Sequence, residues 1–231
     1  MWEERAARAR LLAERYPASG QILLFYGSLA DWQGRPAGGG GGAVEDATRA
    51  LAPLLDLVSR TGPERLAEAA RTIEPERWAA LVADYWRGCA SGTPLDFFAR
   101  AALQPHAAAL PAGEPCAWCA APPQVGALRE QAEGRALDLV CALCLRPRPG
   151  TRGRCAGCGE GTESKLLTFS ADDLAHLALA ACETCRGYLP LVDLSRDPRA
   201  IPEVDELAGL PLDLWAHERG YQKLQPNLAG I

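Results

Sequence analysis

The chain has 231 residues, 48% of them apolar, enough for one or two domains with a sizeable core. Its net charge of −5 disfavours a nucleic-acid partner, because binding to phosphates needs a basic surface. No apolar run approaches the roughly 18 residues that a membrane span needs. The opening MWEERAARAR does not resemble a signal peptide, so we expect a cytoplasmic protein without membrane contact.

Residues 1 to about 110 are dominated by Ala, Leu, Arg and Glu, which are strong helix formers. The pattern predicts helices at Trp2–Tyr16, Gln21–Gln33, Val44–Ser59, Glu64–Ile73, Glu76–Cys89 and Leu95–Ala109. The glycine-rich stretch at residues 35–43 predicts a flexible surface loop, because it lacks the Lys-Ser/Thr of a phosphate-binding loop. We therefore expect a helical domain over residues 1–112, built for packing or docking and without a catalytic site.

The fifth predicted helix carries one apolar stripe that ends at Cys89. Trp78, Leu81, Val82 and Tyr85 precede this cysteine at helical spacing. We expect Cys89 to be a buried thiol and not a reactive group.

After Pro111-Ala112-Gly113 the composition changes to short apolar runs and Gly- and Pro-rich turns, which predicts a small β-rich region. Ala136–Val140 and Lys165–Phe169 are two such runs. Residues 176–180 follow a helix-start signature at Ser170, but HLALA also shows the two-residue alternation of a strand. We expect a strand there, because Cys182 must face back to Cys155. Residues 201–219 return to a helix that begins at Pro202, is kinked or split at Pro211 and ends at Gly220.

Eight of the nine cysteines lie between residues 116 and 185 and form four C-x-x-C pairs, which we call knuckles. The knuckles are Cys116/Cys119, Cys141/Cys144, Cys155/Cys158 and Cys182/Cys185. Two cysteines three residues apart can direct both sulfurs at one point, and two facing knuckles make a tetrahedral four-sulfur site. The β-rich region has few large apolar side chains, so metal binding would supply part of its folding energy. We expect two bound metal ions.

The gaps between knuckles indicate how they pair. The first and second knuckles enclose 21 residues, the third and fourth enclose 23, and only 10 separate the second from the third. The similar gaps indicate a tandem duplication with a period of about 40 residues. We therefore predict one site from Cys116, Cys119, Cys141 and Cys144 and another from Cys155, Cys158, Cys182 and Cys185, with a cross-braced pairing as the alternative.

Closed four-cysteine sites are usually structural, whereas catalytic zinc keeps an open position for water. A disulfide framework suits a secreted chain, and thioredoxin-like chemistry needs one knuckle at a helix start, so neither fits this pattern. His106, His176 and His217 lack partners at ligand spacing. Four arginines (Arg146, Arg148, Arg152 and Arg154) lie between the two predicted sites. We expect them to form a solvated linker that offsets thiolate charge; contact with an acidic partner is the alternative.

The sequence resembles the formate dehydrogenase accessory proteins of the FdhE type along nearly its whole length. The resemblance is carried by RAARARLLAERYPASGQILLFYGSLADWQ near the N-terminus, by the four knuckles in order, by CAGCGE and ACETCRGYL, and by DELAGLPLDLWAHERGY. The chain departs from the family at Arg148, where an aromatic residue is common, and at Pro190, where a lysine is usual. It is also shorter than a typical member, chiefly before residue 112.

The resemblance implies a helical domain (1–112), two rubredoxin-like metal modules (113–150 and 151–200) and a C-terminal helical segment (201–231). It implies iron or zinc at both sites, since four soft sulfur ligands suit either metal. It further implies a non-enzymatic cytoplasmic factor that matures formate dehydrogenase by binding its catalytic subunit. A redox protein with Fe(Cys)₄ sites is the alternative. A zinc-ribbon nucleic-acid binder is less favoured, because residues 114–190 hold 8 Lys and Arg against 9 Asp and Glu.

Overall fold

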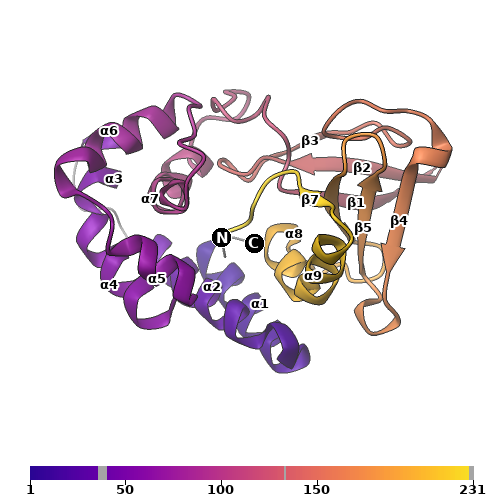
Figure 1. The fold of residues 1–231 in the computed structure, drawn as a ribbon, viewed down its shortest axis with the longest axis horizontal. Coiled ribbons are helices and arrows are strands. Elements are labelled where there is room, and N and C mark those ends of the chain that lie inside the picture. The colour runs from indigo at the N-terminus through magenta and orange to yellow at the C-terminus, as the bar shows by residue number, and fades with distance from the viewer. Residues whose placement is uncertain (36–40, 133, 229–231) are drawn as a thin grey trace.

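The computed structural model describes residues 1–35, 41–132 and 134–228. Figure 1 shows helices gathered in the N-terminal half and a sheet formed by the C-terminal half. The N-terminal helices are α1 (Trp2–Arg15), α2 (Gly20–Gln33), α3 (Ala43–Arg49), α4 (Leu51–Thr61), α5 (Glu64–Ala70), α6 (Pro75–Trp86) and α7 (Leu95–Ala108). Most of the loop predicted at residues 35–43 lies outside the described residues.

The single helix predicted at Val44–Ser59 is wrong, because the chain breaks at Ala50 into α3 and α4. Pro53 explains the break. A proline in a continuous helix would have no N–H for the carbonyl four residues earlier, that of Arg49, and its ring would clash with it. In the first turn of α4 the missing N–H costs nothing, so the helix restarts there.

The prediction that Cys89 is buried on a helical stripe is also wrong. Helix α6 ends at Trp86, and Cys89 follows it as an exposed residue. Gly88 has φ +91°, and its N–H bonds to the carbonyl of Tyr85 while the N–H of Cys89 bonds to that of Asp84. This pair of bonds around a left-handed glycine terminates helices. The helix therefore ends before Cys89, and the last position of the predicted apolar stripe lies outside it.

The strands are β1 (Val125–Gln131), β2 (Gly134–Val140), β3 (Pro147–Pro149), β4 (Leu166–Ser170), β5 (Leu177–Cys182), β6 (Gly187–Asp193) and β7 (Gln222–Lys223). They confirm the predicted strands at 136–140 and 165–169, and the choice of a strand at 176–180. All seven belong to one sheet of order β3-β2-β1-β6-β5-β4, with β7 beside β6. The two cysteine modules thus share a sheet, because β1 pairs in parallel with β6, Gly126 opposite Leu191.

The C-terminal segment lies between the sheet and α1. It contains α8 (Pro202–Asp205), a 3₁₀ turn (Glu206–Gly209) and α9 (Leu210–Glu218), so the predicted helix is split ahead of Pro211. Helix α8 contacts α1, β1 and β6. Gly220, with φ +77°, follows α9 as expected. These contacts place the C-terminal helices between the two halves of the molecule (Figure 1).

Buried ion pairs hold this arrangement. The guanidinium of Arg8 on α1 bonds to Asp205 and lies 2.6 Å from Asp197 Oδ2, and His176 adds a hydrogen bond between its Nε2 and Asp205 Oδ1 at 2.9 Å. Within the 3₁₀ turn, Glu206 Oε2 lies 2.9 Å from Lys223 Nζ. Buried charges are tolerated when they are paired in this way.

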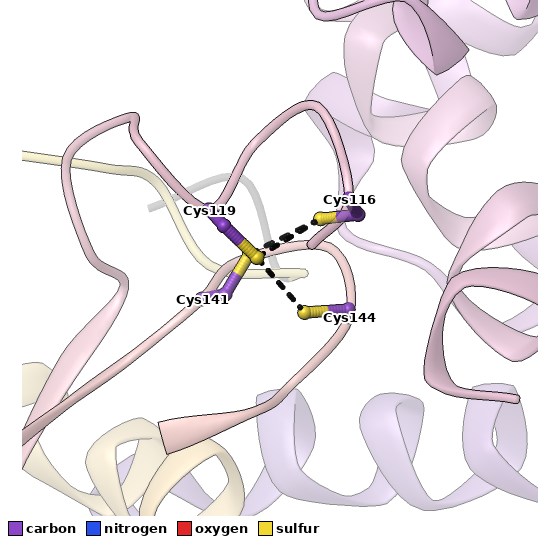
Figure 2. A group of neighbouring side chains, drawn as sticks. All are labelled: Cys116, Cys119, Cys141 and Cys144. Carbon is purple, nitrogen blue, oxygen red and sulfur yellow. Dashed lines mark hydrogen bonds between the residues drawn. The ribbon is translucent and has the colours of Figure 1, made fainter. Parts of the chain in front are cut away.

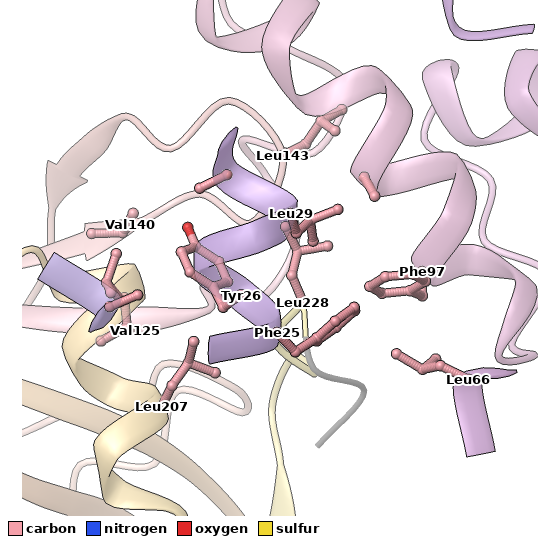
Figure 3. Packing of buried hydrophobic residues seen from close by; sticks show 14 of the residues in the cluster. Phe25, Tyr26, Leu29, Leu66, Phe97, Val125, Val140, Leu143, Leu207 and Leu228 are labelled. Atoms are coloured by element: carbon pink, nitrogen blue, oxygen red, sulfur yellow. The ribbon is translucent and has the colours of Figure 1, made fainter. Parts of the chain in front are cut away.

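One hydrophobic cluster continues from the helices into the cysteine region. Figure 3 shows Tyr26 of α2 near Val125, Val140 and Leu207, and Phe25 of the same helix near Phe97. The fold class predicted from the sequence is therefore confirmed: N-terminal helices, two four-cysteine groups and a C-terminal helical segment. The division at residues 112, 150 and 200 stays a prediction. Within the described parts of the chain, no helix combines the length and apolarity needed to cross a membrane.

Candidate metal centres

The structure groups the eight knuckle cysteines into two sets of four. Site one comprises Cys116, Cys119, Cys141 and Cys144, and site two comprises Cys155, Cys158, Cys182 and Cys185. Within each set the sulfurs lie within 4.8 Å of one another, and all eight thiols are free of disulfides. The grouping is the sequential one that the gaps predict, and the cross-brace is not formed.

The spacing of the sulfurs fits a tetrahedral metal site. Four sulfurs at the zinc–sulfur distance of about 2.3 Å would be about 3.8 Å apart. The Sγ–Sγ distances in site one are 3.6 Å for Cys116–Cys119, Cys116–Cys141 and Cys119–Cys144. In site two the Cys155–Cys185 and Cys158–Cys182 distances are both 3.7 Å. A disulfide would require about 2.05 Å, so the arrangement suits a metal ion held by four thiolates.

A shared backbone conformation shapes three of the four knuckles. The residue after the second cysteine adopts the left-handed conformation in each, with φ 59° at Leu145, 79° at Gly159 and 57° at Arg186. This conformation is uncommon for a residue with a side chain, so its recurrence indicates a turn fixed by its surroundings. It folds the chain back: Cys141 N–H donates to the carbonyl of Arg146, and Cys155 N–H donates to that of Glu160.

Both sites draw their second knuckle from the end of a strand. Val140 ends β2 directly before Cys141, and Cys182 is itself the last residue of β5. The first knuckle of each site precedes β1 or β4 along the chain. The repeated placement of knuckles and strands agrees with the tandem duplication indicated by the spacing.

Site one is embedded against the helices. Cys116, Cys141 and Cys144 are only 8%, 2% and 2% exposed, and Figure 2 shows the four side chains converging from two loops. Between Cys116 and Cys119, Trp118 stacks on Tyr85 of α6 with ring centroids 4.4 Å apart, and its Nε1 donates to the Tyr85 carbonyl at 2.7 Å. The first knuckle is therefore attached to α6 by an aromatic contact and a buried hydrogen bond.

Helix α7 supports the second knuckle of site one. Arg100 Nε and Gln104 Nε2 each donate to the carbonyl of Ala142 at 3.0 Å. Ala142 lies between Cys141 and Cys144, so these bonds fix the loop that carries both sulfurs. The other Arg100 nitrogens donate to Gln124 and to the carbonyl of Pro226, which joins α7 to the sheet and to the C-terminal segment. No local sequence pattern marks Arg100, because its partners are distant in the chain.

Site two lies at the surface. Cys158 and Cys185 are exposed, Cys155 is partly buried and Cys182 is buried. The carboxylate of Glu160, after the third knuckle, accepts from the Thr184 hydroxyl in the fourth at 2.6 Å and from the N–H of Thr162 at 2.8 Å. The Thr184 bond and then the amide bonds lower the pKa of Glu160 to about 2. This carboxylate thus bridges the two knuckles, a role that the sequence motif CAGCGE does not reveal.

In each site the pKa of one thiol is lowered, which favours the thiolate form that binds metal, while the pKa values of Cys116, Cys144, Cys155 and Cys185 are raised. In site one, the side chains of Cys116 and Cys144 lower the pKa of Cys141 to about 2. In site two, burial raises the pKa of Cys182, but the N–H groups of Cys185 and Thr184 outweigh it and lower the pKa to about 7. Each strand-end cysteine is therefore disposed to ionise.

The remaining candidates from the sequence lie apart from these sites. Cys89 is exposed and belongs to neither group. His176 forms a compact group with Asp197 and Asp205, which sequence spacing could not show. Because the Arg8 guanidinium already bonds to both carboxylates, we assign this group to the buried ion pairs and not to a metal. Burial lowers the pKa of His106 on α7, and His217 is exposed on α9.

The linker arginines divide into two kinds. Arg146 donates to the carbonyls of Pro111 at 2.9 Å and Glu114 at 2.8 Å, and Arg148 donates to that of Ala121 at 3.2 Å. These two fasten the linker to the first knuckle loop. Arg152 and Arg154 are exposed, as expected for a solvated linker.

Comparisons with known proteins agree on one family. A family model described as FdhE, C-terminal domain, matches residues 154–229, which include all of site two. The Protein FdhE homolog of Aquifex aeolicus is 28% identical over 193 residues, which cover 77% of this chain and 68% of that protein. The homolog from Pseudomonas aeruginosa is 33% identical over 118 residues, 49% of this chain and 38% of that protein.

The fold matches a solved structure over nearly its full length. The crystal structure of the FdhE protein from Pseudomonas aeruginosa superposes with a TM-score of 0.70 at 24% sequence identity. The match covers 99% of this chain and 95% of that one. The chain therefore has the same overall fold as that protein.

Proposed function

We propose that this chain, as a member of the FdhE-type family of formate dehydrogenase accessory proteins, assists the maturation of formate dehydrogenase by binding the catalytic subunit in the cytoplasm. It acts as a non-enzymatic binding protein. Each of its two four-cysteine sites holds one iron or zinc ion, through Cys116, Cys119, Cys141 and Cys144 and through Cys155, Cys158, Cys182 and Cys185.

The observation that carries this proposal is the pair of four-sulfur sites within a fold that matches an FdhE protein along 99% of the chain. A closed set of four thiolates uses every position of a tetrahedral metal, so substrate has no place to coordinate. The metal contributes folding energy when bound. The role of this chain's own residues is to hold the knuckles rigid: Arg100 and Gln104 at site one, Glu160 at site two.

The proposal is tested by deleting the gene in its host and measuring formate-dependent respiration. We expect activity to fall, to return with the wild-type gene, and to stay low with Cys141→Ala/Cys144→Ala. Cys89→Ser is the matched control, because Cys89 lies outside both sites; it should restore activity fully. Capture of the tagged chain from the same cells should recover the catalytic subunit. Normal formate dehydrogenase activity in the deletion strain would contradict the proposal.

A second candidate is a redox role with iron at site two. The exposure of Cys158 and Cys185 supports it, because electron exchange with a partner requires an accessible metal site. An iron-loaded protein would then show a reversible one-electron potential. Absence of that potential, together with captured catalytic subunit, would leave the binding role alone.

A further inference from the structure

The two sites differ sharply in their access to solvent. In site one, Cys116, Cys141 and Cys144 are buried, and Cys119 is partly buried. In site two, Cys182 alone is buried, and both second-position cysteines, Cys158 and Cys185, are exposed. Two sites of the same ligand set and similar sulfur spacing therefore present their metal ions to very different surroundings.

The two sites also differ in what must move for them to open. The knuckles of site one are tied to α6 through Trp118 and to α7 through the Ala142 carbonyl. Leu143, in the second knuckle, is 0% exposed within the main hydrophobic cluster. Releasing these sulfurs therefore requires disruption of the helical core, which opens as rarely as the whole molecule unfolds.

Site two is anchored on one side only, where its fourth knuckle contacts the C-terminal segment: the Tyr221 hydroxyl donates to Glu183, and the Arg186 guanidinium donates to the Arg219 carbonyl. Leu224 packs against Gly157 and Gly187, so closely that a Cβ added at either glycine would lie 2.6 Å from Leu224 Cδ2. On the solvent side, the bond between Glu160 and Thr184 spans the knuckles; Thr184 is exposed and Glu160 is half-buried. The third knuckle and the turn after it contain Gly157, Gly159 and Gly161, which favour local opening.

We propose that site two is an exchangeable metal site and that site one is a permanent structural one. Exchange proceeds by substitution: a soft donor from solution, a thiolate or a chelating nitrogen, binds the metal as Cys158 or Cys185 departs. The departing thiolate keeps its electron pair and takes a proton from water, and no electron is transferred. This inference rests on the proposed metal binding and assigns the exchange to one of the two sites.

The test uses full-length protein loaded with two zinc ions, verified by native mass spectrometry. An excess of the coloured chelator PAR (pyridylazoresorcinol) then reports zinc release by absorbance. We expect one equivalent to leave in a fast phase and the second at least about tenfold more slowly, because its release needs opening of the core. Two equivalents leaving at a single rate would overturn the inference but leave the two-site proposal standing. Failure to load a second zinc ion would overturn both.

The released site is identified in wild-type protein, which avoids variants that do not fold. After the fast phase, N-ethylmaleimide labels free thiols and peptide mapping locates them. We expect labels at Cys155, Cys158, Cys182 and Cys185, together with the exposed Cys89; labels appearing first at Cys141 and Cys144 would overturn the inference. Leu224→Ala uncovers the inner side of site two and should quicken only the fast phase. Leu11→Ala, at a 51% exposed leucine of α1, is the matched control.

Discussion

Arg100 offers a direct test of how the helices support site one. Its guanidinium is buried and donates to the carbonyls of Ala142 and Pro226 and to Gln124. Replacing it with methionine keeps much of the side-chain volume but leaves three acceptors without that donor. The substitution Arg100→Met should therefore destabilise the protein without altering any metal ligand.

The expected magnitude follows from these contacts. A hydrogen bond to a charged group contributes about 1.5–3 kcal/mol, so three bonds represent about 4.5–9 kcal/mol. The Ala142 carbonyl keeps its bond from Gln104, and the methionine side chain gains apolar contacts, so only part of this sum is lost. We therefore predict that Arg100→Met lowers the free energy of unfolding by about 2–4 kcal/mol.

The measurement is urea unfolding of zinc-saturated protein at one fixed free-zinc concentration, because bound metal contributes to apparent stability. Arg77→Met is the matched control. Arg77 is 82% exposed in its side chain, and its ion pair with Glu74 spans 3.6 Å, so its loss should cost under about 0.5 kcal/mol. If both variants unfold at the same urea concentration, the assigned role of Arg100 is incorrect.

Three further predictions concern single residues. Cys89→Ser should retain both metal equivalents by elemental analysis, because Cys89 is exposed and outside both groups; loss of one equivalent would show a misassigned ligand. Glu160→Ala should weaken zinc retention at site two only, read from the fast phase of chelator release, and an unchanged fast phase would refute the bridge to Thr184. Gly88→Ala should lower the free energy of unfolding by about 1–2 kcal/mol, because its φ of +91° strains a residue with a side chain. The loss should exceed that of Gly92→Ala, because an added Cβ at Gly88 would lie 3.3 Å from Ala117 Cβ while Gly92 has open space. Equal losses in the two variants would exclude a cost from the Ala117 contact.

Local sequence patterns predicted the features that depend on near neighbours. Knuckle spacing and gap lengths gave the grouping of the eight cysteines, because a C-x-x-C pair constrains its own sulfurs. The strand at residues 176–180 was also predicted, since Cys182 must return to the third knuckle. The two wrong helix predictions also have local causes. Pro53 lacks the N–H that a continuous helix needs, and Gly88 forms the left-handed turn that ends α6 before Cys89.

The remaining features depend on contacts between distant segments. The parallel pairing of β1 with β6 has no signature in either strand alone. Arg8 reaches Asp205 across 197 positions, and Arg100 reaches Pro226 across 126. The difference in exposure between the two sites arises because α6 and α7 pack against site one, whereas Cys158 and Cys185 of site two face solvent, although the cysteine spacing of the two is nearly the same.

The most direct test of two closed four-sulfur centres is X-ray absorption spectroscopy on protein whose metal content has been counted. Two metal ions per chain, each with four sulfur neighbours at about 2.3 Å for zinc and no nitrogen or oxygen ligand, is the expected result. Fewer than two ions in protein purified without oxygen, or a nitrogen or oxygen atom in either coordination shell, would contradict it.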